Sequence, residues 1–493
     1  MSENSVKEKN VKKNYIYNVA YQLLVIITPL LTAPYIARVL GAEGIGTFSY
    51  VTAIAAFFII FANLGTTTYG QREVSYVQFD RHARSVAFYN TLVFRITSTL
   101  VFTALFGIFI IVARPDYMII YVIQLVEIIN VACDVSWFFQ GLEEFGKIVG
   151  RNAIFRLVNL AMVFTLIKDS DDLALYTAAT AFITMAGHVS LWFYLPRYLE
   201  HVDRSELTPF RDTRVILGLF LPTIAVQIYQ YMDKVMIGIF TTDNTENGYY
   251  ESAMRITRMV LVLVTSMSTV MVPRIGRYFK EGNKALIRKS MYNAYRFAWF
   301  LGLPLMFGLF GIADNFIPWF YGPGYEKVNT IIKIVSVITV AISINNVTGV
   351  EYLVPTKRER LYTRTILIGT LVNLVLNTLL IPRYASYGAA IASVIAESTI
   401  AIVQLICIRK ELSLSHIFSF SVKYLISAAL MLMLLEVEGQ YMQPTIGNTF
   451  FMIISGAGIY FGLLYVFADS FFITNAKLVI DKLQSRIGRR RRL

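Results

Sequence analysis

Long apolar stretches alternate with short polar segments along almost the whole chain. A helix of about 18 or more apolar residues spans the hydrocarbon core of a bilayer, so such stretches indicate transmembrane helices. Hydropathy predicts about 14 of them. They lie at 15–37, 46–65, 87–112, 117–139, 152–167, 173–195, 214–240, 248–272, 291–312, 328–354, 364–381, 386–408, 421–436 and 447–468. The pattern therefore predicts an all-α integral membrane protein.

Lysine and arginine gather in every second connection between these predicted helices. Most of the 45 basic residues lie in the two terminal segments and these alternate connections. The opposite connections hold only about five: Arg38, Arg114, Lys168, Lys327 and Arg383. Positive residues accumulate on the cytoplasmic side of membrane proteins, so both termini are predicted to be cytoplasmic.

Composition supports a membrane protein and argues against a secreted disulfide scaffold. The chain is 56% hydrophobic and 16% charged, whereas soluble proteins are about 25% charged. The two cysteines, Cys133 and Cys407, both lie in apolar stretches, so no disulfide framework is expected. The first apolar run exceeds the length of a signal peptide and lacks a cleavage site, so we interpret it as a retained first span.

The connections are too short to form an enzyme domain. The longest, near 196–213 and 273–290, contain fewer than about 20 residues each. The sequence shows no metal-ligand spacing, no Walker loop and no GxSxG motif. The segment GAEGIG (41–46) joins two predicted membrane helices and is interpreted as a turn. We therefore expect a transporter without cofactor, driven by an ion gradient, by substrate turnover or by a partner.

An internal repeat predicts two related bundles. LVNLAMVFTLI (157–167) and LVNLVLNTLLI (371–381) match at six of eleven positions without gaps. A shift of six helices preserves orientation, which suits two parallel bundles that alternate access. We expect two pseudo-symmetric six-helix bundles plus two C-terminal helices. The parts are a cytoplasmic tail 1–14, an N-lobe 15–195, a cytoplasmic linker 196–213, a C-lobe 214–408, helices 13 and 14 at 409–468, and a basic cytoplasmic tail 469–493.

One unusual segment, DVSWFFQGLEEFGKIVGRN (134–152), lies between two apolar stretches. It is predicted to form the cytoplasmic end of the fourth helix, a turn at Gly141 and the start of the fifth helix. Trp137 and the adjacent phenylalanines fit an interfacial aromatic belt, and Lys147 fits an inside loop. This interpretation leaves Asp134 unexplained.

Ionisable side chains also occur inside the predicted spans. Each costs about 2.5–3.5 kcal/mol or more at bilayer depth and usually faces a cavity or a partner. Gln124, Glu127 and Asp134, for example, share one face of the fourth helix at i, i+3 and i+10. Helical depth places these charges in two sets: Arg95, Asp134 and Arg156 in the cytoplasmic half, and Lys234, Glu251 and Arg255 in the outer half. Each set is either an internal ion-pair network or part of a wet cavity.

Five motifs together resemble the Wzx-type polysaccharide flippases of the multidrug/oligosaccharidyl-lipid/polysaccharide exporter superfamily. They are APYIARVLGAEGIGTFSY (33–50), YGQREVS (69–75), CDVSWFFQGLEEF (133–145), YMDKVMIG (231–238) and GYYESAMRI (248–256). The resemblance covers about residues 14 to 410. It implies a two-lobed transporter of 14 helices in the bacterial cytoplasmic membrane. It also implies a substrate, a polyprenyl-diphosphate-linked oligosaccharide unit for capsule, O-antigen or exopolysaccharide synthesis.

Under this hypothesis the deep charges have two roles. Cations are expected to bind the diphosphate, because arginine suits phosphate geometry. Carboxylates are expected to couple or gate transport, with H+ or Na+ as candidate coupling ion. The expected substrate-binding residues are Arg95, Arg156, Lys234, Arg255 and Arg258, and the coupling or gating residues are Glu127, Asp134, Glu251 and Glu397.

Alternative functions remain open at this point. A cation-coupled drug antiporter of the same superfamily would need an acidic or aromatic cavity, and the deep cations argue against it. A lipid II flippase is a close relative. A membrane polymerase would need a large external loop, and the sequence has none. Expected partners are undecaprenyl-diphosphate-linked oligosaccharide and membrane lipids, with a polymerase and glycosyltransferases as candidates, and no nucleic acid. The tail IGRRRRL (487–493) is either held near anionic lipids or acts only as a topology signal.

Overall fold

Helices form the whole regular structure of the described chain. The structure is a computed structural model that describes residues 3–478 and 481, with side chains described at 24, 27–220, 224, 227, 229–478 and 481. No strand occurs within this part of the chain. The predicted lipid contact of residues 487–493 lies outside the described residues.

The chain divides into two compact units, Met1–Glu251 and Ser252–Leu493, which are described separately. The helices of unit 1 are α1 (Glu3–Asn63), α2 (Thr66–Tyr76), α3 (Arg81–Ala113), α4 (Met118–Cys133), α5 (Ser136–Gly141), α6 (Phe145–Leu166), α7 (Leu173–Ser190) and α8 (Thr213–Phe240), with short 3-10 turns at Ser170–Asp172, Trp192–Arg197 and Arg204–Glu206. Helix α9 (Thr245–Thr265) begins in unit 1 and ends in unit 2.

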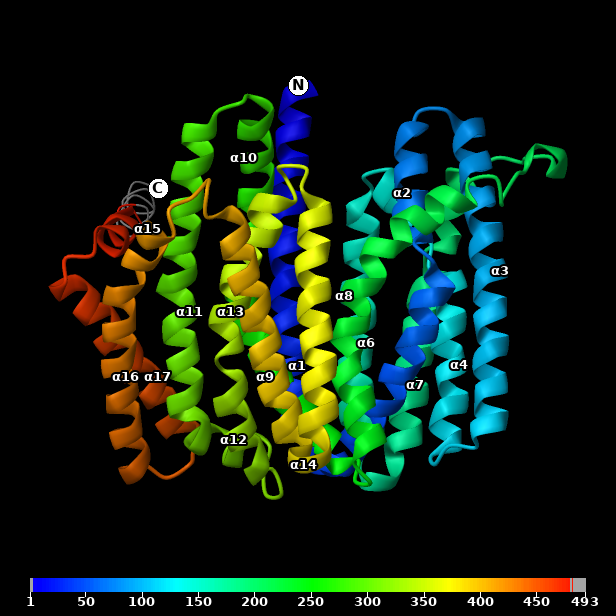
Figure 1. Ribbon diagram of the computed structural model, residues 1–493. Helices are drawn as coiled ribbons and strands as arrows, with labels where there is room; N and C mark the ends of the chain where they lie inside the picture. The colour runs from blue at the N-terminus through cyan, green and yellow to red at the C-terminus, as the bar shows by residue number, and fades with distance from the viewer. Residues whose placement is uncertain (1–2, 479–480, 482–493) are drawn as a thin grey trace, which may run out of the picture. The chain divides into compact units, whose positions relative to one another are not determined.

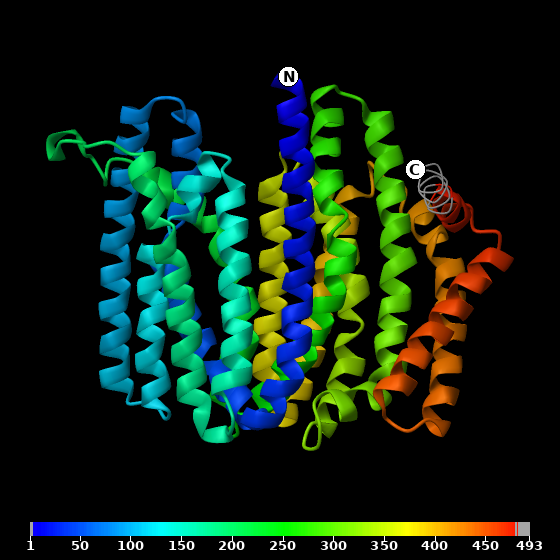
Figure 2. The ribbon, with the colours of Figure 1, turned by 180° about the vertical axis from the view of Figure 1, so that it is seen from behind.

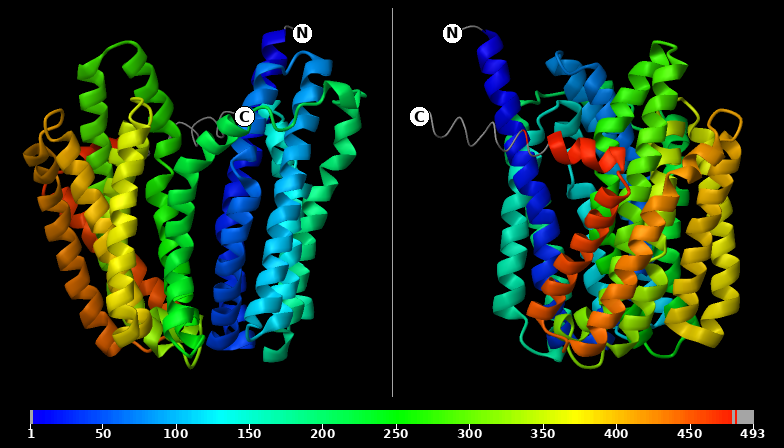
Figure 3. Two further views of the ribbon diagram at one scale, coloured as in Figure 1. Left: turned by 45° about the vertical axis from the view of Figure 1, so that its right-hand side comes forward. Right: turned by 90° about the vertical axis from the view of Figure 1, so that its left-hand side faces the viewer.

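Unit 2 continues with a second set of long helices. They are α10 (Ser268–Lys280), α11 (Lys284–Phe320), α12 (Glu326–Val335), α13 (Ile338–Asn345), a π-helical segment (Asn346–Leu353), α14 (Glu359–Ile408), α15 (Leu414–Ser419), α16 (Ser421–Tyr441) and α17 (Ile446–Val466). Helices α16 and α17 form a hairpin against α11, and the right-hand view of Figure 3 brings this hairpin to the front.

The apolar helices are long enough to cross a membrane. Ten of them pass by length and composition among the described residues, or eleven if the bent pair α9 and α10 counts as one span. Two of the ten are interrupted: Gly41 (φ 68°) breaks α1 and Ala385 (φ 48°) breaks α14. These breaks fall in the predicted turns between 37 and 46 and between 381 and 386. The all-helical membrane fold is confirmed, and the total of 14 spans stays a prediction.

Within unit 1, α1 is the helix that contacts most of the others. It packs against α3, α4, α6 and α8, and α7 packs against α4 and α6 (Figures 1 and 2). Between α1, α3 and α4 lies a core that contains the fully buried Val51, Phe106 and Ile128. Helix α8, which starts the predicted C-lobe, belongs to unit 1 and packs against α1 and α2 there. The predicted lobes rest on the internal repeat and stay a prediction.

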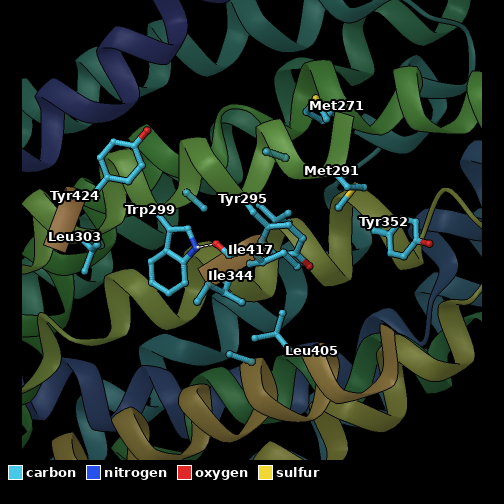
Figure 4. Close-up of a cluster of buried hydrophobic side chains, with 14 of the residues drawn as sticks. Met271, Met291, Tyr295, Trp299, Leu303, Ile344, Tyr352, Leu405, Ile417 and Tyr424 are labelled. Carbon is cyan, nitrogen blue, oxygen red and sulfur yellow. Dashed lines mark hydrogen bonds between the residues drawn. The ribbon is translucent and has the colours of Figure 1, made fainter. Parts of the chain in front are cut away.

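Unit 2 is built around α11. Its buried face carries Met291, Tyr295 and Trp299, which belong to the core cluster of Figure 4, and α11 packs against α13, α16 and the π-helical segment. The indole nitrogen of Trp299 donates a hydrogen bond to the carbonyl oxygen of Ile417 at 3.1 Å, which fixes α15 to this core. Buried tryptophan usually needs such a partner for its N–H group.

The two repeated segments share the same burial class at six of their eleven positions. Segment 157–167 covers the end of α6 and the residue after it, and segment 371–381 lies on α14. In both, the first residue is exposed, as are the eighth and ninth, while the seventh and the last are buried. Ile167 and Ile381 are the buried last residues, with exposed fractions of 0% and 1%. The two segments are therefore partly alike in the residues that they bury within their own units.

Candidate functional site

A buried arginine joins three helices of unit 1. Arg95, on α3, is 2% exposed. Its Nε donates to the carbonyl oxygen of Val131, and its Nη1 donates to Oγ1 of Thr66 at 3.2 Å and of Thr67 at 3.0 Å. Its Nη2 lies 3.7 Å from Oδ2 of Asp134. The guanidinium is thus satisfied by protein groups, as a buried charge must be.

Asp134 ends α4 and starts the turn into α5. One carboxylate oxygen accepts a hydrogen bond from the backbone N–H of Ser136 at 2.9 Å and another from its hydroxyl. The other oxygen faces Arg95. Helical depth places both Arg95 and Arg156 at the level of Asp134, and the ion pair of Asp134 is with Arg95. The charges predicted in the cytoplasmic half were interpreted either as an ion-pair network or as part of a cavity. For Arg95 and Asp134 the structure supports the ion pair.

The aromatic segment after Asp134 is core and does not form an interfacial belt. Trp137, Phe138 and Phe139 are each 0% exposed. Trp137 stacks on Phe88 at 5.5 Å between ring centroids. The belt interpretation is therefore wrong. Hydropathy cannot distinguish an aromatic that faces lipid from one that faces another helix, because both environments are apolar.

Two of the five sequence motifs meet at this segment. A Cβ atom at Gly70 would lie 2.4 Å from the indole of Trp137, and one at Gly141 would lie 2.7 Å from the carbonyl oxygen of Gln71. Helices α2 and α5 therefore approach closely at both glycines. YGQREVS and CDVSWFFQGLEEF form one packing unit, and each has a glycine where the backbone leaves no room for a side chain.

The other three motifs meet at a second contact. A Cβ atom at Gly46 would lie 1.7 Å from the carbonyl oxygen of Asn244, and one at Gly248 would lie 1.9 Å from that of Ala42. Gly238 is covered by the ring of Tyr50, 2.2 Å from a built Cβ. These backbones touch, so glycine is the residue that fits.

Beside this contact, α8 and the start of α9 share a network of charged and polar groups. Nζ of Lys234 lies 2.8 Å from Oε2 of Glu251, with both side chains 12% exposed. Asn247 donates to the carbonyl oxygen of Lys234 at 2.8 Å. Tyr250 donates its hydroxyl to Asp233 at 2.5 Å. Lys234 and Glu251, predicted at the same depth, are thus brought together as an ion pair.

Unit 1 also encloses a cavity of about 410 Å³. Residues of α1, α2, α4, α7 and α8 line it. The polar lining includes Thr52, Gln124, Glu127, Thr180, Gln227 and Tyr231. Glu127 is its one carboxylate among the described residues, and neither lysine nor arginine lines it there.

The lining around Glu127 is rich in oxygen atoms. Oε2 of Glu127 accepts a hydrogen bond from Asn130 at 3.1 Å. Gln124 is 2% exposed and donates to Thr52 at 3.0 Å. Oε1 of Gln124 and Oγ1 of Thr180 have no hydrogen-bond partner among the residues that the structure describes. A carboxylate among neutral oxygens can take up a proton or hold a small cation, since both neutralise its charge.

The remaining predicted residues lie in different surroundings. Arg156 on α6 and Arg255 on α9 are half-buried, and Arg258 is exposed with its Nε 3.2 Å from the carbonyl oxygen of Met254. Glu397 on α14 accepts a hydrogen bond from Asn345 at 2.6 Å. The predicted substrate-binding cations are absent from the described lining of the unit 1 cavity, so their role stays a prediction.

Some cavity residues escaped the sequence analysis. Thr177 and Thr180 line the cavity from α7. Their i, i+3 spacing in an otherwise apolar helix is the same signal that identified Gln124 and Glu127. In unit 2, Glu351 is 1% exposed and accepts from Ser268 at 3.0 Å. No cluster of three or more His, Cys, Asp or Glu suited to a metal occurs in the described part of the chain.

Comparison with known proteins agrees with this architecture. The family model "Polysaccharide biosynthesis protein" matches residues 11–279, and the family model "Lipid II flippase MurJ" matches residues 155–457. A protein of Escherichia coli (strain K12) named "Putative O-antigen transporter" is 22% identical over 412 residues, which cover 82% of this chain and 97% of that protein.

Two solved structures share the fold. The lipid II flippase MurJ in an inward closed conformation superposes with a TM-score of 0.72 at 15% identity, covering 92% of this chain and 98% of that chain. An inward-facing multidrug resistance MATE family transporter superposes with a TM-score of 0.60 at 15% identity, covering 80% and 98%. At such identities the likeness concerns the fold alone.

Proposed function

Since this chain belongs to the polysaccharide biosynthesis protein family and also fits the MurJ family model, we propose that it flips lipid-linked oligosaccharide units. The cargo would be a polyprenyl-diphosphate-linked repeat unit that crosses the cytoplasmic membrane from the inner to the outer leaflet. The observation that carries this proposal is the relative named an O-antigen transporter, matched along 97% of its length. Apolar helices that can span a bilayer are the structural requirement for this activity.

The cations proposed to bind the diphosphate fall into two groups. Arg156, Arg255 and Arg258 are half-buried or exposed, so a diphosphate could reach them in this conformation. Arg95 and Lys234 each face a carboxylate already and would have to exchange that partner for the substrate. We therefore propose Arg156 in unit 1 and, separately, Arg255 and Arg258 in unit 2 as residues that first contact phosphate. The undecaprenyl tail would stay in lipid throughout.

Glu127 is proposed to couple transport to an ion gradient. Its carboxylate lines a cavity with oxygen-bearing neighbours and without a described lysine or arginine. Such a group is stable when it binds a proton or Na+ and costly when bare, so ion binding and release can bias the conformational equilibrium. Asp134, Glu251 and Glu397 would act as gates through the partners that the structure gives them.

We further propose that the protein transports without chemical conversion, with both termini in the cytoplasm. The basic residues of alternate connections support this orientation. A polymerase and glycosyltransferases that act on the same lipid are proposed as functional partners. Alternating access between the two internally repeated bundles would move the cargo.

A reconstitution assay tests the function directly. Proteoliposomes receive a fluorescent polyprenyl-diphosphate oligosaccharide, and a membrane-impermeant quencher reports its arrival at the other leaflet. We expect faster loss of protected fluorescence than in empty liposomes. Lipid II and a cationic dye serve as competing substrates. Preferential movement of lipid II would favour the MurJ-like alternative, and transport of the dye alone would refute the proposal.

A further inference from the structure

Unit 2 contains a cavity of about 450 Å³ that three turns at one end of the unit enclose. These turns connect α10 to α11, the π-helical segment to α14, and α14 to α15, and all three lie at the upper end of unit 2 in Figure 1. Four cations line the cavity, Lys284, Arg288, Arg358 and Lys410, against one carboxylate, Glu411. The cavity lining therefore carries an excess of positive charge.

One of the four cations is already fixed by protein contacts. Nη1 of Arg358 donates to Oε1 of Glu411 at 2.6 Å, and its Nε donates to Oγ1 of Thr356 at 3.1 Å. Its guanidinium lies 4.6 Å from the ring centroid of Tyr352, whose hydroxyl donates to the other oxygen of Glu411. Tyr352 itself belongs to the buried core of unit 2 (Figure 4). The floor of the cavity is thus connected to the buried core of unit 2.

Both oxygens of Glu411, the carboxylate in the described lining, accept hydrogen bonds within this network. Partial burial alone would raise the pKa of Glu411, but the hydrogen bonds from Tyr352 and Arg358 and the charges of Arg358 and Lys284 hold that pKa below its ordinary value. Glu411 is therefore ionised at neutral pH and pairs with Arg358. One carboxylate cannot neutralise four cations, so the described lining keeps an excess of positive charge.

The other three cations have no ion pair of their own. The side chains of Lys284, Arg288 and Lys410 make no hydrogen bond or ion pair with the residues that the structure describes, although the charge of Lys284 interacts with that of Glu411. Lys284 is also the first residue of α11, whose N-terminal N–H groups add partial positive charge. Like charges gathered in one cavity repel each other, and a bound anion would remove that cost.

The lining of the cavity favours an anion that carries an apolar part. Phe279, Ile287 and Leu412 line it beside the cations. The three turns also connect helices that are long and apolar enough to span a membrane, so the cavity lies at the level where lipid headgroups would be. Basic pockets between membrane helices bind the phosphate groups of anionic lipids.

We propose that this cavity binds the phosphate headgroup of an anionic membrane phospholipid, with Lys284, Arg288 and Lys410 as the phosphate-binding residues. Arg358 acts as a fixed wall of the site. Phosphate chemistry alone would also admit a soluble phosphate, and the apolar lining is the feature that selects the lipid. The proposal does not depend on which cargo the protein transports.

A matched pair of variants separates this site from general surface charge. The cavity variant combines Lys284→Gln, Arg288→Gln and Lys410→Gln. The control variant combines Lys280→Gln, Lys289→Gln and Arg409→Gln, which are exposed residues of the same segments that do not line the cavity. Both variants lose the same charge. Purified full-length proteins are titrated with cardiolipin in mixed micelles, and bound lipid is counted by native mass spectrometry.

We expect the cavity variant to bind cardiolipin about 100-fold more weakly than the wild type, since each basic contact contributes about a fivefold factor. The control variant should lose much less affinity. Thermal unfolding without lipid verifies that both variants fold. A similar loss in both variants, or none in the cavity variant, would overturn the proposal.

Separate titrations identify the source of the phosphate. Phosphatidylcholine micelles, which carry no net charge, should not replace cardiolipin. Inorganic phosphate and pyrophosphate are added as competitors at matched ionic strength. Weak competition supports a lipid site. Displacement of cardiolipin at concentrations near its own would show that the cavity takes soluble phosphate, and the lipid assignment would then fail.

Discussion

The guanidinium of Arg95 lies 3.7 Å from the carboxylate of Asp134, inside unit 1 and almost out of contact with solvent. Arg95 lies in the middle of α3, and Asp134 lies at the end of α4. The same guanidinium donates hydrogen bonds to two threonines of α2. One side chain thus determines how three helices meet.

Arg95→Ala should destabilise the protein by about 3–5 kcal/mol, because it removes the buried guanidinium that joins three helices and leaves the partly buried Asp134 without its counter-charge. Unfolding in detergent, followed by tryptophan fluorescence, measures the loss. Arg211→Ala, which removes an exposed arginine, should change stability by no more than about 0.5 kcal/mol. The double variant Arg95→Ala, Asp134→Asn should lose less than the sum of the single changes. Strict additivity would show that the pair contributes nothing.

Phe138→Ala should cost about 3–5 kcal/mol, because its ring is fully buried and the change leaves a cavity. Phe193→Ala provides the matched control, since this ring is 81% exposed. It should be nearly neutral. Thermal unfolding of both variants distinguishes a core role from a belt role for the aromatic segment. Equal effects of the two substitutions would contradict the packing described above.

Gly46→Ala should destabilise the protein by at least about 1–3 kcal/mol, because the new methyl group would overlap the carbonyl oxygen of Asn244. Gly107→Ala is the control. Gly107 lies within α3, nothing lies within 4 Å of a built Cβ, and alanine favours a helix by up to about 1 kcal/mol. The two substitutions should shift the unfolding temperature in opposite directions. A stabilising Gly46→Ala would exclude the close backbone contact.

Glu127→Gln should keep the protein folded but reduce gradient-driven transport by about tenfold or more, since an amide cannot bind a proton or cation in the same way. Flipping is measured in proteoliposomes with an imposed proton gradient and, separately, a Na+ gradient. Glu43→Gln, at an exposed position outside the cavity, should behave as the wild type. The gradient whose effect disappears in Glu127→Gln identifies the ion. An unchanged response to both gradients would remove Glu127 from coupling.

The contact between Arg358 and Glu411 predicts a pH dependence on the acid side. The pKa of Glu411 lies below its ordinary value of 4.5, so its contribution to stability is present above pH 4.5. It is lost as the pH falls through the pKa of the folded state. The pair is partly exposed, so we expect less than about 1 kcal/mol. Unfolding of wild type and Glu411→Gln, compared between pH 3 and 7, should converge only below about pH 4.5. A constant difference down to the lowest pH would disprove the coupling.

The sequence predicted the helices and the breaks at Gly41 and Ala385 because these follow from local hydropathy and chain geometry. Helical depth also placed Lys234 and Glu251 at the same level, where the structure pairs them, but it left open whether such charges pair or line a cavity. The partner of Asp134 was not predictable, because helical depth alone does not determine which of two arginines lies closer in space. That choice depends on how α3 and α4 cross.

The role of the basic turns in unit 2 was also missed. Lys284, Arg358 and Lys410 were interpreted only as signals of membrane orientation. Their charge pattern along the chain is the same whether they scatter over a surface or enclose one cavity. The two cases differ only in three dimensions, where three turns come together around one cavity. A motif search could not have found this site, since its residues come from segments more than 50 positions apart.

The close contact of Gly70 with Trp137 limits what sequence searches with this motif can reveal about cargo. The most recognisable block of this chain, CDVSWFFQGLEEF, is held by the requirements of helix packing within the carrier. Its buried aromatic side chains, Trp137, Phe138 and Phe139, are not free to adapt to a sugar. A search with this block should therefore retrieve carriers of very different glycans with equal ease. The cargo of a newly sequenced relative must be inferred from other positions, or from the enzymes encoded beside it.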